Sequence, residues 1–202
     1  MGMQAKIGLP DITSADAANK NARLLNWPIL YDASCQFSHP ELSELLLLWR
    51  GMVDRGDVPR RQTMTARLLQ PYLRIIALYE RVAELDGSRR YRVRLMGGAV
   101  VQMLGELTGR FLDEVLPEKF LPRWYPMLDI PLATAAPLRI LARVDTVEKS
   151  YIIGENFCAP LRAEDGEIKI VLIATCYDGN RSWTDVAAEE CRRLGLEPLG
   201  IV

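Results

Sequence analysis

The stretch from Arg90 to Gly98 constrains the possible fold of this chain more than any other. Its side chains alternate strictly between a charged and an apolar set, Arg90, Arg92 and Arg94 against Tyr91, Val93 and Leu95. This two-residue period predicts a strand with one exposed face and one buried face. Gly97 and Gly98 end the strand, and helical spacing of apolar residues follows up to the turn Gly105–Gly109. This order of elements is uncommon, so it narrows the choice of fold.

The segment before this strand is predicted to hold two helices and a partner strand. Ser38 can cap a helix that has Pro40 in its first turn and reaches about Asp54. Its apolar face is broad and needs partners on more than one side; it comprises Leu42, Leu45, Leu46, Leu48, Trp49, Met52 and Val53. A shorter helix is expected over Thr63–Gln70 and a strand over Leu73–Leu85.

The two strands are predicted to form a hairpin around the turn Asp86–Ser88. A three-residue loop places Glu84 opposite Arg90 and Glu80 opposite Arg94, whereas a two-residue loop puts these charges on opposite faces. Cross-strand pairing of opposite charges favours the three-residue loop.

The second half of the chain is predicted to be helical first and extended afterwards. Residues 111–136 cannot form one unbroken helix, because prolines interrupt them at Pro117, Pro122, Pro126 and Pro131. Three strands follow over 138–147, 151–162 and 168–177, and the last is apolar on both faces, as a central strand should be. A further helix is expected after Ser182, with Gly195 at its end.

The motif Arg90–Gly97, followed by a short apolar turn and Leu104–Arg110, resembles the opening of PAS sensor domains. It is most similar to a bacterial group of stand-alone PAS proteins, although Gly98 stands where that group often has a hydroxyl residue. The resemblance extends over about residues 45–178. It implies an α+β fold with a five-stranded antiparallel sheet in the spatial order 2-1-5-4-3, helices over the concave face and an N-terminal helical extension.

The chain would then divide into an irregular N-terminal arm (1–37), N-terminal helices (38–71), a PAS-like core (72–178) and a C-terminal extension with a short helix (179–202).

The composition argues against several kinds of partner. Lys and Arg number 25 against 26 Asp and Glu, which predicts no nucleic-acid surface. The chain contains no apolar run of the roughly 20 residues that span a membrane, and its start lacks the pattern of a secretory signal. The four cysteines have no metal-like spacing, so we expect reduced thiols in a cytoplasmic protein.

We expect neither a metal site nor haem, because His39 is the only histidine and is placed at an exposed helix start. We also expect no flavin, since the segment around Cys158 falls on a strand rather than on the middle helix that carries the cysteine of light-sensing PAS domains. No catalytic residue is assigned, because the chain has no nucleophile elbow and no phosphate-binding loop.

Glu155 breaks the apolar pattern of its predicted strand. If its face of the strand lines a cavity, Glu155 is a buried acid that needs a partner. The alternative, which we favour, is that a bulge at Gly154 turns Glu155 towards water, because a glycine within a strand often marks a bulge. The candidate ligand-pocket residues are Met103, Trp124, Tyr125, Met127, Tyr151, Glu155 and Phe157.

The resemblance implies a non-enzymatic sensory or regulatory module that binds a small molecule or a partner protein and signals through protein contacts. No output domain is expected in the short segment after Asp178. We predict a homodimer that uses the apolar residues of 40–54 and the outer face of the sheet, or a separate signalling partner. The alternative is a small cone-shaped or hot-dog-like enzyme with Glu155 or Asp145 as general acid or base; a third possibility is an interaction domain without a ligand.

Overall fold

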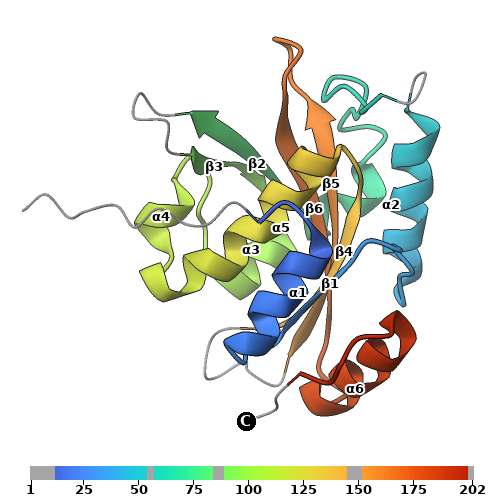
Figure 1. The fold of residues 1–202 in the computed structure, drawn as a ribbon. Coiled ribbons are helices and arrows are strands. Elements are labelled where there is room, and N and C mark those ends of the chain that lie inside the picture. The colour runs from blue at the N-terminus through green and yellow to red at the C-terminus, as the bar shows by residue number, and fades with distance from the viewer. Residues whose placement is uncertain (1–11, 54–56, 84–88, 145–151, 200–202) are drawn as a thin grey trace, which may run out of the picture.

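The computed structural model describes residues 12–53, 57–83, 89–144 and 152–199 of the chain. Helices alternate with strands in a mixed α+β arrangement, as predicted (Figure 1). The elements are α1 (Ala15–Leu24), β1 (Ile29–Asp32), α2 (Pro40–Gly51), η1 (Gln70–Ile75), β2 (Ile76–Ala83), β3 (Arg89–Met96), α3 (Gly98–Leu104), α4 (Leu112–Val115), η2 (Glu118–Phe120), α5 (Leu121–Thr134), β4 (Leu138–Arg143), β5 (Ile153–Arg162), β6 (Ile168–Asp178) and α6 (Trp183–Leu194).

The strands form one antiparallel sheet in the order β1-β4-β5-β6-β2-β3. Without β1, the order from the other edge is β3-β2-β6-β5-β4, which is the predicted order 2-1-5-4-3. As predicted, β2 pairs with both β3 and β6, and β6 lies inside the sheet. The fold is therefore PAS-like, but the expectation of five strands is wrong because β1 adds a sixth at the edge beside β4.

The segment 1–37 was predicted to be irregular, and this is wrong for its described part. Ser14 caps α1 by accepting a hydrogen bond from the amide of Ala17, and β1 is buried at every position. The side chain of Asn19 binds both the amide and the carbonyl of Tyr31, at 2.9 and 2.7 Å, and so covers the free edge of β1. These elements give little signal in the sequence, because α1 buries mainly alanines and β1 has no alternation.

Helices cover both faces of the sheet (Figure 1). The inner face, as we call it, packs against α1, α3 and α5, which agrees with the predicted helices over one face. The outer face packs against α2, the segment 58–75 and α6. A layer of apolar side chains therefore lies on each side of the strands.

The position of α2 contradicts its predicted role as a dimer interface. Leu42, Leu45, Leu46 and Trp49 are buried against the outer face of the chain's own sheet, and Leu48, Met52 and Val53 are half-buried there. The indole Nε1 of Trp49 donates a 2.9 Å hydrogen bond to the carbonyl of Pro160 on β5. The surplus apolar surface of the helix is thus covered within the molecule, and the outer face is not free for a second copy.

Two helical boundaries differ from the prediction. Residues 63–69 form turns rather than a helix, and η1 then leads into β2, which begins at Ile76 instead of Leu73. The break expected among the prolines comes before Leu121, since α5 accommodates Pro122 in its first turn and Pro126 and Pro131 in its interior. Pro122 costs no helical hydrogen bond in the first turn, whereas Pro126 and Pro131 each remove the bond from their own position to the carbonyl four residues earlier.

The hairpin of β2 and β3 keeps the predicted faces but shifts the register by two residues. Glu80 lies opposite Arg92, and Val82 lies opposite Arg90. Because the shift is even, the charged face is unchanged, and Glu80 still forms an ion pair with Arg94 at 2.5 Å. The predicted turn at 86–88 and Glu84 lie outside the described residues.

Gly97 has a structural role where β3 meets α3. A Cβ atom at this position would lie 2.1 Å from the carbonyl oxygen of Leu73 in η1, whereas one at Gly98 would have nothing within 4 Å. The amide of Gly97 donates to the carbonyl of Ile76 at 2.7 Å. The first glycine of the pair is therefore required by the close approach of two backbones.

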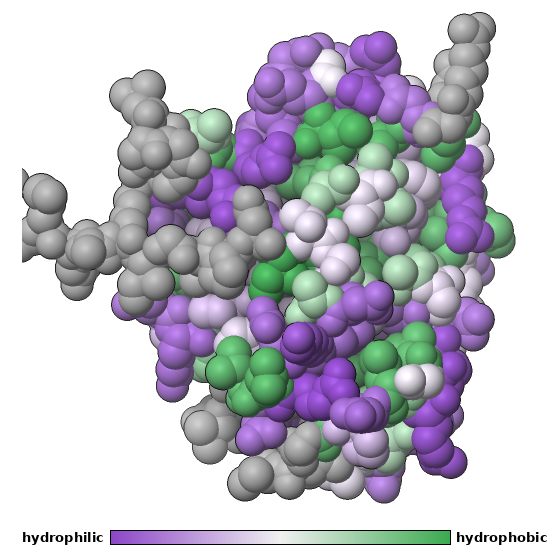
Figure 2. All heavy atoms as spheres, viewed as in Figure 1, coloured by the Kyte–Doolittle hydropathy of each residue, from purple (hydrophilic) through white to green (hydrophobic). Residues whose placement is uncertain are grey.

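The C-terminal helix α6 begins and ends as predicted. Ser182 accepts a hydrogen bond from the amide of Asp185, and Gly195 adopts a left-handed conformation with φ of 66°. Figure 2 shows a mainly hydrophilic surface with an apolar patch over the end of α1, where Leu24 and Leu25 are exposed. None of the described helices is long and apolar enough to cross a membrane.

Candidate functional site

A cavity of about 280 Å³ lies between the inner face of the sheet and the helices α3, η2 and α5. Its volume is at the lower end of the range of small-molecule sites. It is bounded by Ile29, Ala77, Tyr79, Val100, Met103, Leu104, Leu116, Pro117, Phe120, Arg123, Trp124, Met127, Ala142, Arg143, Val144, Gly154, Asn156, Ile173, Thr175 and Tyr177.

Small residues on the strands create the space. Ala142 on β4 lies opposite Gly154 on β5, and Gly154 lies opposite Tyr177 on β6. A Cβ atom on Gly154 would come within 3.3 Å of the Thr175 methyl group. Larger side chains at these positions would fill the cavity from its floor.

The floor also carries a polar pair that satisfies its own hydrogen bonds. Thr175 donates to the Oδ1 atom of Asn156 at 2.7 Å, and the Nδ2 atom of Asn156 donates to the carbonyls of Ile140 and Gly154 at 3.1 and 3.2 Å. Both side chains are buried. The pair fixes the spacing of β5 and β6 and leaves the floor with little hydrogen-bonding capacity for an occupant.

Two arginines line the cavity. The guanidinium of Arg123 on α5 lies 4.8 Å from the centre of the Phe120 ring, and its residue is buried, whereas Arg143 at the end of β4 is half-buried. Burial lowers the pKa of Arg123 to about 10; the positive charge of Arg143 also lowers it, while the nearby Tyr31 acts in the opposite direction.

The structure brings three of the seven candidate pocket residues to this cavity, namely Met103, Trp124 and Met127. Tyr125 packs instead against Tyr91, with ring centres 5.2 Å apart, and Tyr151 lies outside the described residues. Glu155 and Phe157 lie on the outer face, so the prediction is wrong for them. Period-2 alternation separates the two faces of β5 but does not say which one lines the cavity, and the small, polar inner side resembles a solvated face.

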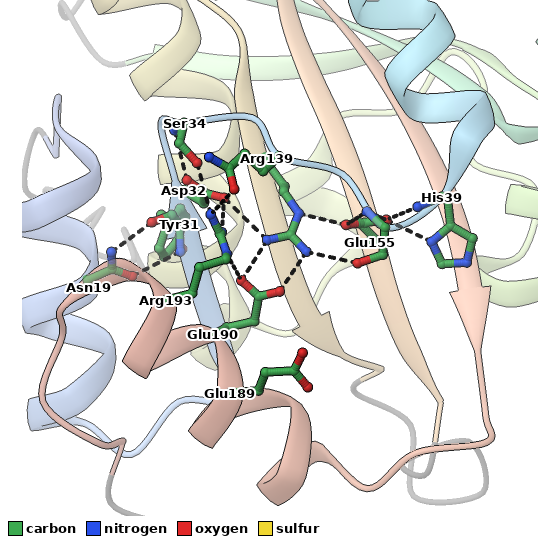
Figure 3. A network of polar contacts seen from close by, with 12 residues as sticks. Asn19, Tyr31, Asp32, Ser34, His39, Arg139, Glu155, Glu189, Glu190 and Arg193 are labelled. Carbon is green, nitrogen blue, oxygen red and sulfur yellow. Dashed lines mark hydrogen bonds and ion pairs between the residues drawn. The ribbon is translucent and has the colours of Figure 1, made fainter.

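A buried ionic cluster occupies the outer face behind the cavity (Figure 3). We call it the Arg139 network; it comprises Asp32, Ser38, His39, Arg139, Glu155, Glu190 and Arg193. It joins the end of β1, the start of α2, the strands β4 and β5, and α6. The sequence analysis missed this cluster, because its members lie far apart in the sequence.

Arg139 is the centre of the network and only 1% of it is exposed. Its Nε atom donates to Glu155 at 2.6 Å, its Nη1 and Nη2 atoms donate to the two carboxylate oxygens of Glu190 at 2.9 Å each, and Nη1 also reaches Asp32 at 3.2 Å. Asp32 is directly opposite Arg139 in the pairing of β1 with β4. A second guanidinium, that of Arg193, binds Glu190 at 2.8 Å and also binds Asp32.

Glu155 matches neither alternative from the sequence, since it neither lines the cavity nor faces water. Its pairing with neighbouring strands is regular at Gly154, without a bulge, and only 2% of it is exposed. Its carboxylate accepts hydrogen bonds from the amides of Ser38 and His39 at 2.9 Å each and contacts Nδ1 of His39 at 2.7 Å. The expectation that Ser38 caps α2 is therefore wrong, because His39 is the cap residue and Glu155 supplies the acceptor.

The environment keeps the three acids of the network ionised. Burial opposes ionisation of Glu155, but the hydrogen bonds from Ser38, His39 and Arg139 outweigh it and lower its pKa. The same balance applies to Glu190, where Arg139 and Arg193 are the donors and its pKa is lowered. Burial of Asp32 is likewise outweighed by hydrogen bonds from Ser34 and Arg193, so that its pKa is lowered.

This environment offers no support for the enzyme alternative. Glu155 is saturated with donors and lies on the face of the sheet opposite the cavity, and a carboxylate with a lowered pKa is a weak general base. Asp145, the other candidate, lies outside the described residues. Within the described ranges there is no group of three His, Cys, Asp or Glu side chains that could hold a metal ion. The four cysteines are free thiols.

Comparison with known proteins finds only distant similarity of fold. No family model and no curated protein matches the sequence. Among solved structures, the chain is similar to a light-oxygen-voltage domain whose mechanism was probed with a flavin analogue (TM-score 0.43, 14% identity, 66% of this chain and 97% of that one). It is also similar to an RNA-binding light-oxygen-voltage receptor (TM-score 0.40, 13% identity, 88% of this chain and 54% of that one). A third similar structure is the blue-light photoreceptor domain of Aureochrome1 (TM-score 0.40, 12% identity, 64% of this chain and 98% of that one).

These matches contradict the expectation that a flavin is excluded. The earlier inference depended on one cysteine position, but a solved domain with a similar fold was studied with a flavin analogue. The absence of a nucleic-acid partner stays a prediction.

Proposed function

We propose that this chain is a sensory or regulatory module of the PAS type, without enzymatic activity, that binds a small molecule in the cavity and passes its state to other proteins. One observation carries the proposal: consecutive residues of β5 face the cavity and the Arg139 network. Asn156 lines the cavity, and the neighbouring Glu155 holds the start of α2 and the guanidinium of Arg139.

The network supplies a route from the cavity to the surface. Arg139 also binds Glu190 on α6, so a displacement of β5 changes the attachment of two helices on the outer face. Glu155 and Arg139 are buried ions whose geometry must be nearly ideal to offset their desolvation. A small shift of β5 is therefore expected to alter how firmly α6 is held, and α6 is the surface that we propose a partner protein reads.

The remaining assignments follow from weaker observations. Free cysteines at all four positions suit the reducing cytoplasm. Formation of a homodimer stays a prediction, but the apolar residues of α2 are no longer its proposed interface. The proposal does not depend on the identity of the small molecule. A flavin is one candidate, in view of the similar light-oxygen-voltage domain that was studied with a flavin analogue.

The test is a native mass spectrum of the purified protein compared with its denatured mass, together with an absorption spectrum for flavin. We expect a bound small molecule, and we expect the variant Ala142→Phe to lose it because the new ring fills the cavity floor. Ala17→Phe, at an exposed position of α1, is the matched control and should retain the ligand. Wild-type and Ala142→Phe proteins that carry the same extra mass would show that the ligand binds elsewhere.

The relay is tested separately by hydrogen exchange. Emptying the cavity should change amide protection in α6 and at the start of α2 as well as in β5. A change confined to β5 and α5 would contradict the proposed route through Glu155 and Arg139, while leaving ligand binding itself intact.

A further inference from the structure

Among the described residues, the charged side chains that line the cavity are both arginines. Arg123 and Arg143 contribute to its wall, and the described lining contains no aspartate or glutamate. Most of the remaining wall is apolar or aromatic, and it includes Phe120, Trp124 and Met127. The cavity therefore combines an apolar body with two positive charges.

The two arginines belong to elements that meet at one side of the cavity. Arg123 lies in the first half of α5 and Arg143 is the last residue of β4, and α5 packs against that strand. Their charges interact, since Arg143 lowers the pKa of Arg123. Among the residues that the structure describes, Arg143 has no ion pair. A bound anion that pairs with Arg143 would therefore be favoured at this side of the cavity.

The strand floor of the cavity is mainly apolar, apart from Tyr79, Asn156, Thr175 and Tyr177. Thr175 donates a hydrogen bond to Asn156, and Asn156 donates to two backbone carbonyls. The same floor also contains Ala77, Ala142 and Ile173. A ligand group that needs hydrogen bonds would lose them there. The apolar end of an occupant fits this floor, which leaves its charged end to the arginines.

We propose that the ligand is a small apolar, most suitably aromatic, carboxylate whose acid group binds Arg123 and Arg143 and whose body lies against Trp124 and the strand floor. This inference rests on the proposed function, because it names the ligand class of the same cavity. A guanidinium matches a carboxylate through two parallel hydrogen bonds, and about 280 Å³ suits a compact ligand.

The experiment compares two probes of the same shape that differ in charge, 2-naphthoate and 2-naphthamide, by isothermal titration calorimetry on the ligand-stripped protein. The wild-type protein should bind the carboxylate about tenfold or more tightly than the amide, as expected for charge-assisted hydrogen bonds. Arg143→Gln should weaken naphthoate about tenfold and leave naphthamide unchanged. Arg94→Gln replaces an exposed arginine of β3 that is not part of the lining, and it should change neither affinity.

Arg123→Gln is a second variant that should weaken naphthoate binding to the same extent. Because Arg123 is buried, its affinity is interpreted only if its circular dichroism spectrum matches that of the wild type. Equal affinity for both probes, or naphthoate binding that survives Arg143→Gln, would overturn the carboxylate assignment while the sensory role stands. Tighter binding of 2-naphthyl phosphate than of naphthoate would also overturn it, in favour of a phosphate.

The failure of the proposed function has a different signature. If neither probe binds and the native mass shows no ligand, the cavity is not a binding site and both proposals fall. If a ligand is present in the native mass but the probes do not displace it, the ligand class alone is wrong.

Discussion

The substitution Arg139→Gln tests the physical account of the network most directly. It leaves three carboxylates in the outer layer without their central cation: Asp32 is 3% exposed, Glu155 2% and Glu190 9%. Removing one partner of a buried ion pair costs about 3–5 kcal/mol, because the charge that remains is desolvated and unpaired. Against a typical total of about 5–15 kcal/mol, this is a large share of the free energy of unfolding.

The matched control is Arg94→Gln, which breaks the ion pair with Glu80 on the exposed face of the hairpin. The side chain of Arg94 is 53% exposed, so this loss should be about 0–1 kcal/mol. Urea unfolding followed by tryptophan fluorescence gives both values. For a chain of this size, the loss at Arg139 corresponds to a fall in Tm of about 6–20 °C.

The pH dependence of the difference separates ionic from packing effects. The three acids have lowered pKa values in the folded protein, so their contribution is complete above the ordinary carboxyl values and is lost as the pH falls through the folded ones. The difference between wild type and Arg139→Gln should therefore narrow in acid. A loss below about 1 kcal/mol at neutral pH, or a difference independent of pH, would refute the account.

Three further predictions concern the acids, the glycine pair and α2. The wild-type protein should lose stability as the pH falls below about 4.5, because protonation of the acids in the Arg139 network removes the negative charges that bind its arginines. A free energy of unfolding that stays constant in urea melts between about pH 3 and 6 would contradict this. Gly97→Ala should cost about 3 kcal/mol or more through its backbone clash, while Gly98→Ala, at the start of α3, should be neutral or stabilising by about 0.5–1 kcal/mol; equal Tm values would show the clash to be absent. Leu45→Ala should lower the free energy of unfolding by about 2–5 kcal/mol without altering the sedimentation coefficient, whereas a change in association at unchanged stability would restore α2 as an interface.

Much of the sheet could be predicted from local pattern. The alternation in Arg90–Leu95 defined a strand with a charged face, and the apolar run Ile170–Ala174 identified a strand inside the sheet. Ser182 and Gly195 marked both ends of α6. These signals are reliable because they act within one element, where backbone geometry alone relates neighbouring side chains.

The candidate site could be predicted only in part. Met103, Trp124 and Met127 line the cavity, and their role as ligand contacts stays a prediction. Glu155 was noticed, but neither alternative given for it was right, since alternation defines two faces of a strand without stating which one lines the cavity. The cationic lining by Arg123 and Arg143 was not foreseen, because each arginine looks like an ordinary surface residue in its own segment.

By itself, the sequence determined the kinds and order of most elements from residue 40 onward and the antiparallel arrangement of the main strands. Only the tertiary structure decided that α2 covers its own sheet, that β1 extends the edge, and that Arg139 collects acids from distant segments. Arg139 and Asp32 are 107 positions apart, and no local period relates residues at that distance. Whether a charge is exposed or buried depends on what packs over it, and that is settled only when α2 and α6 close over the outer face.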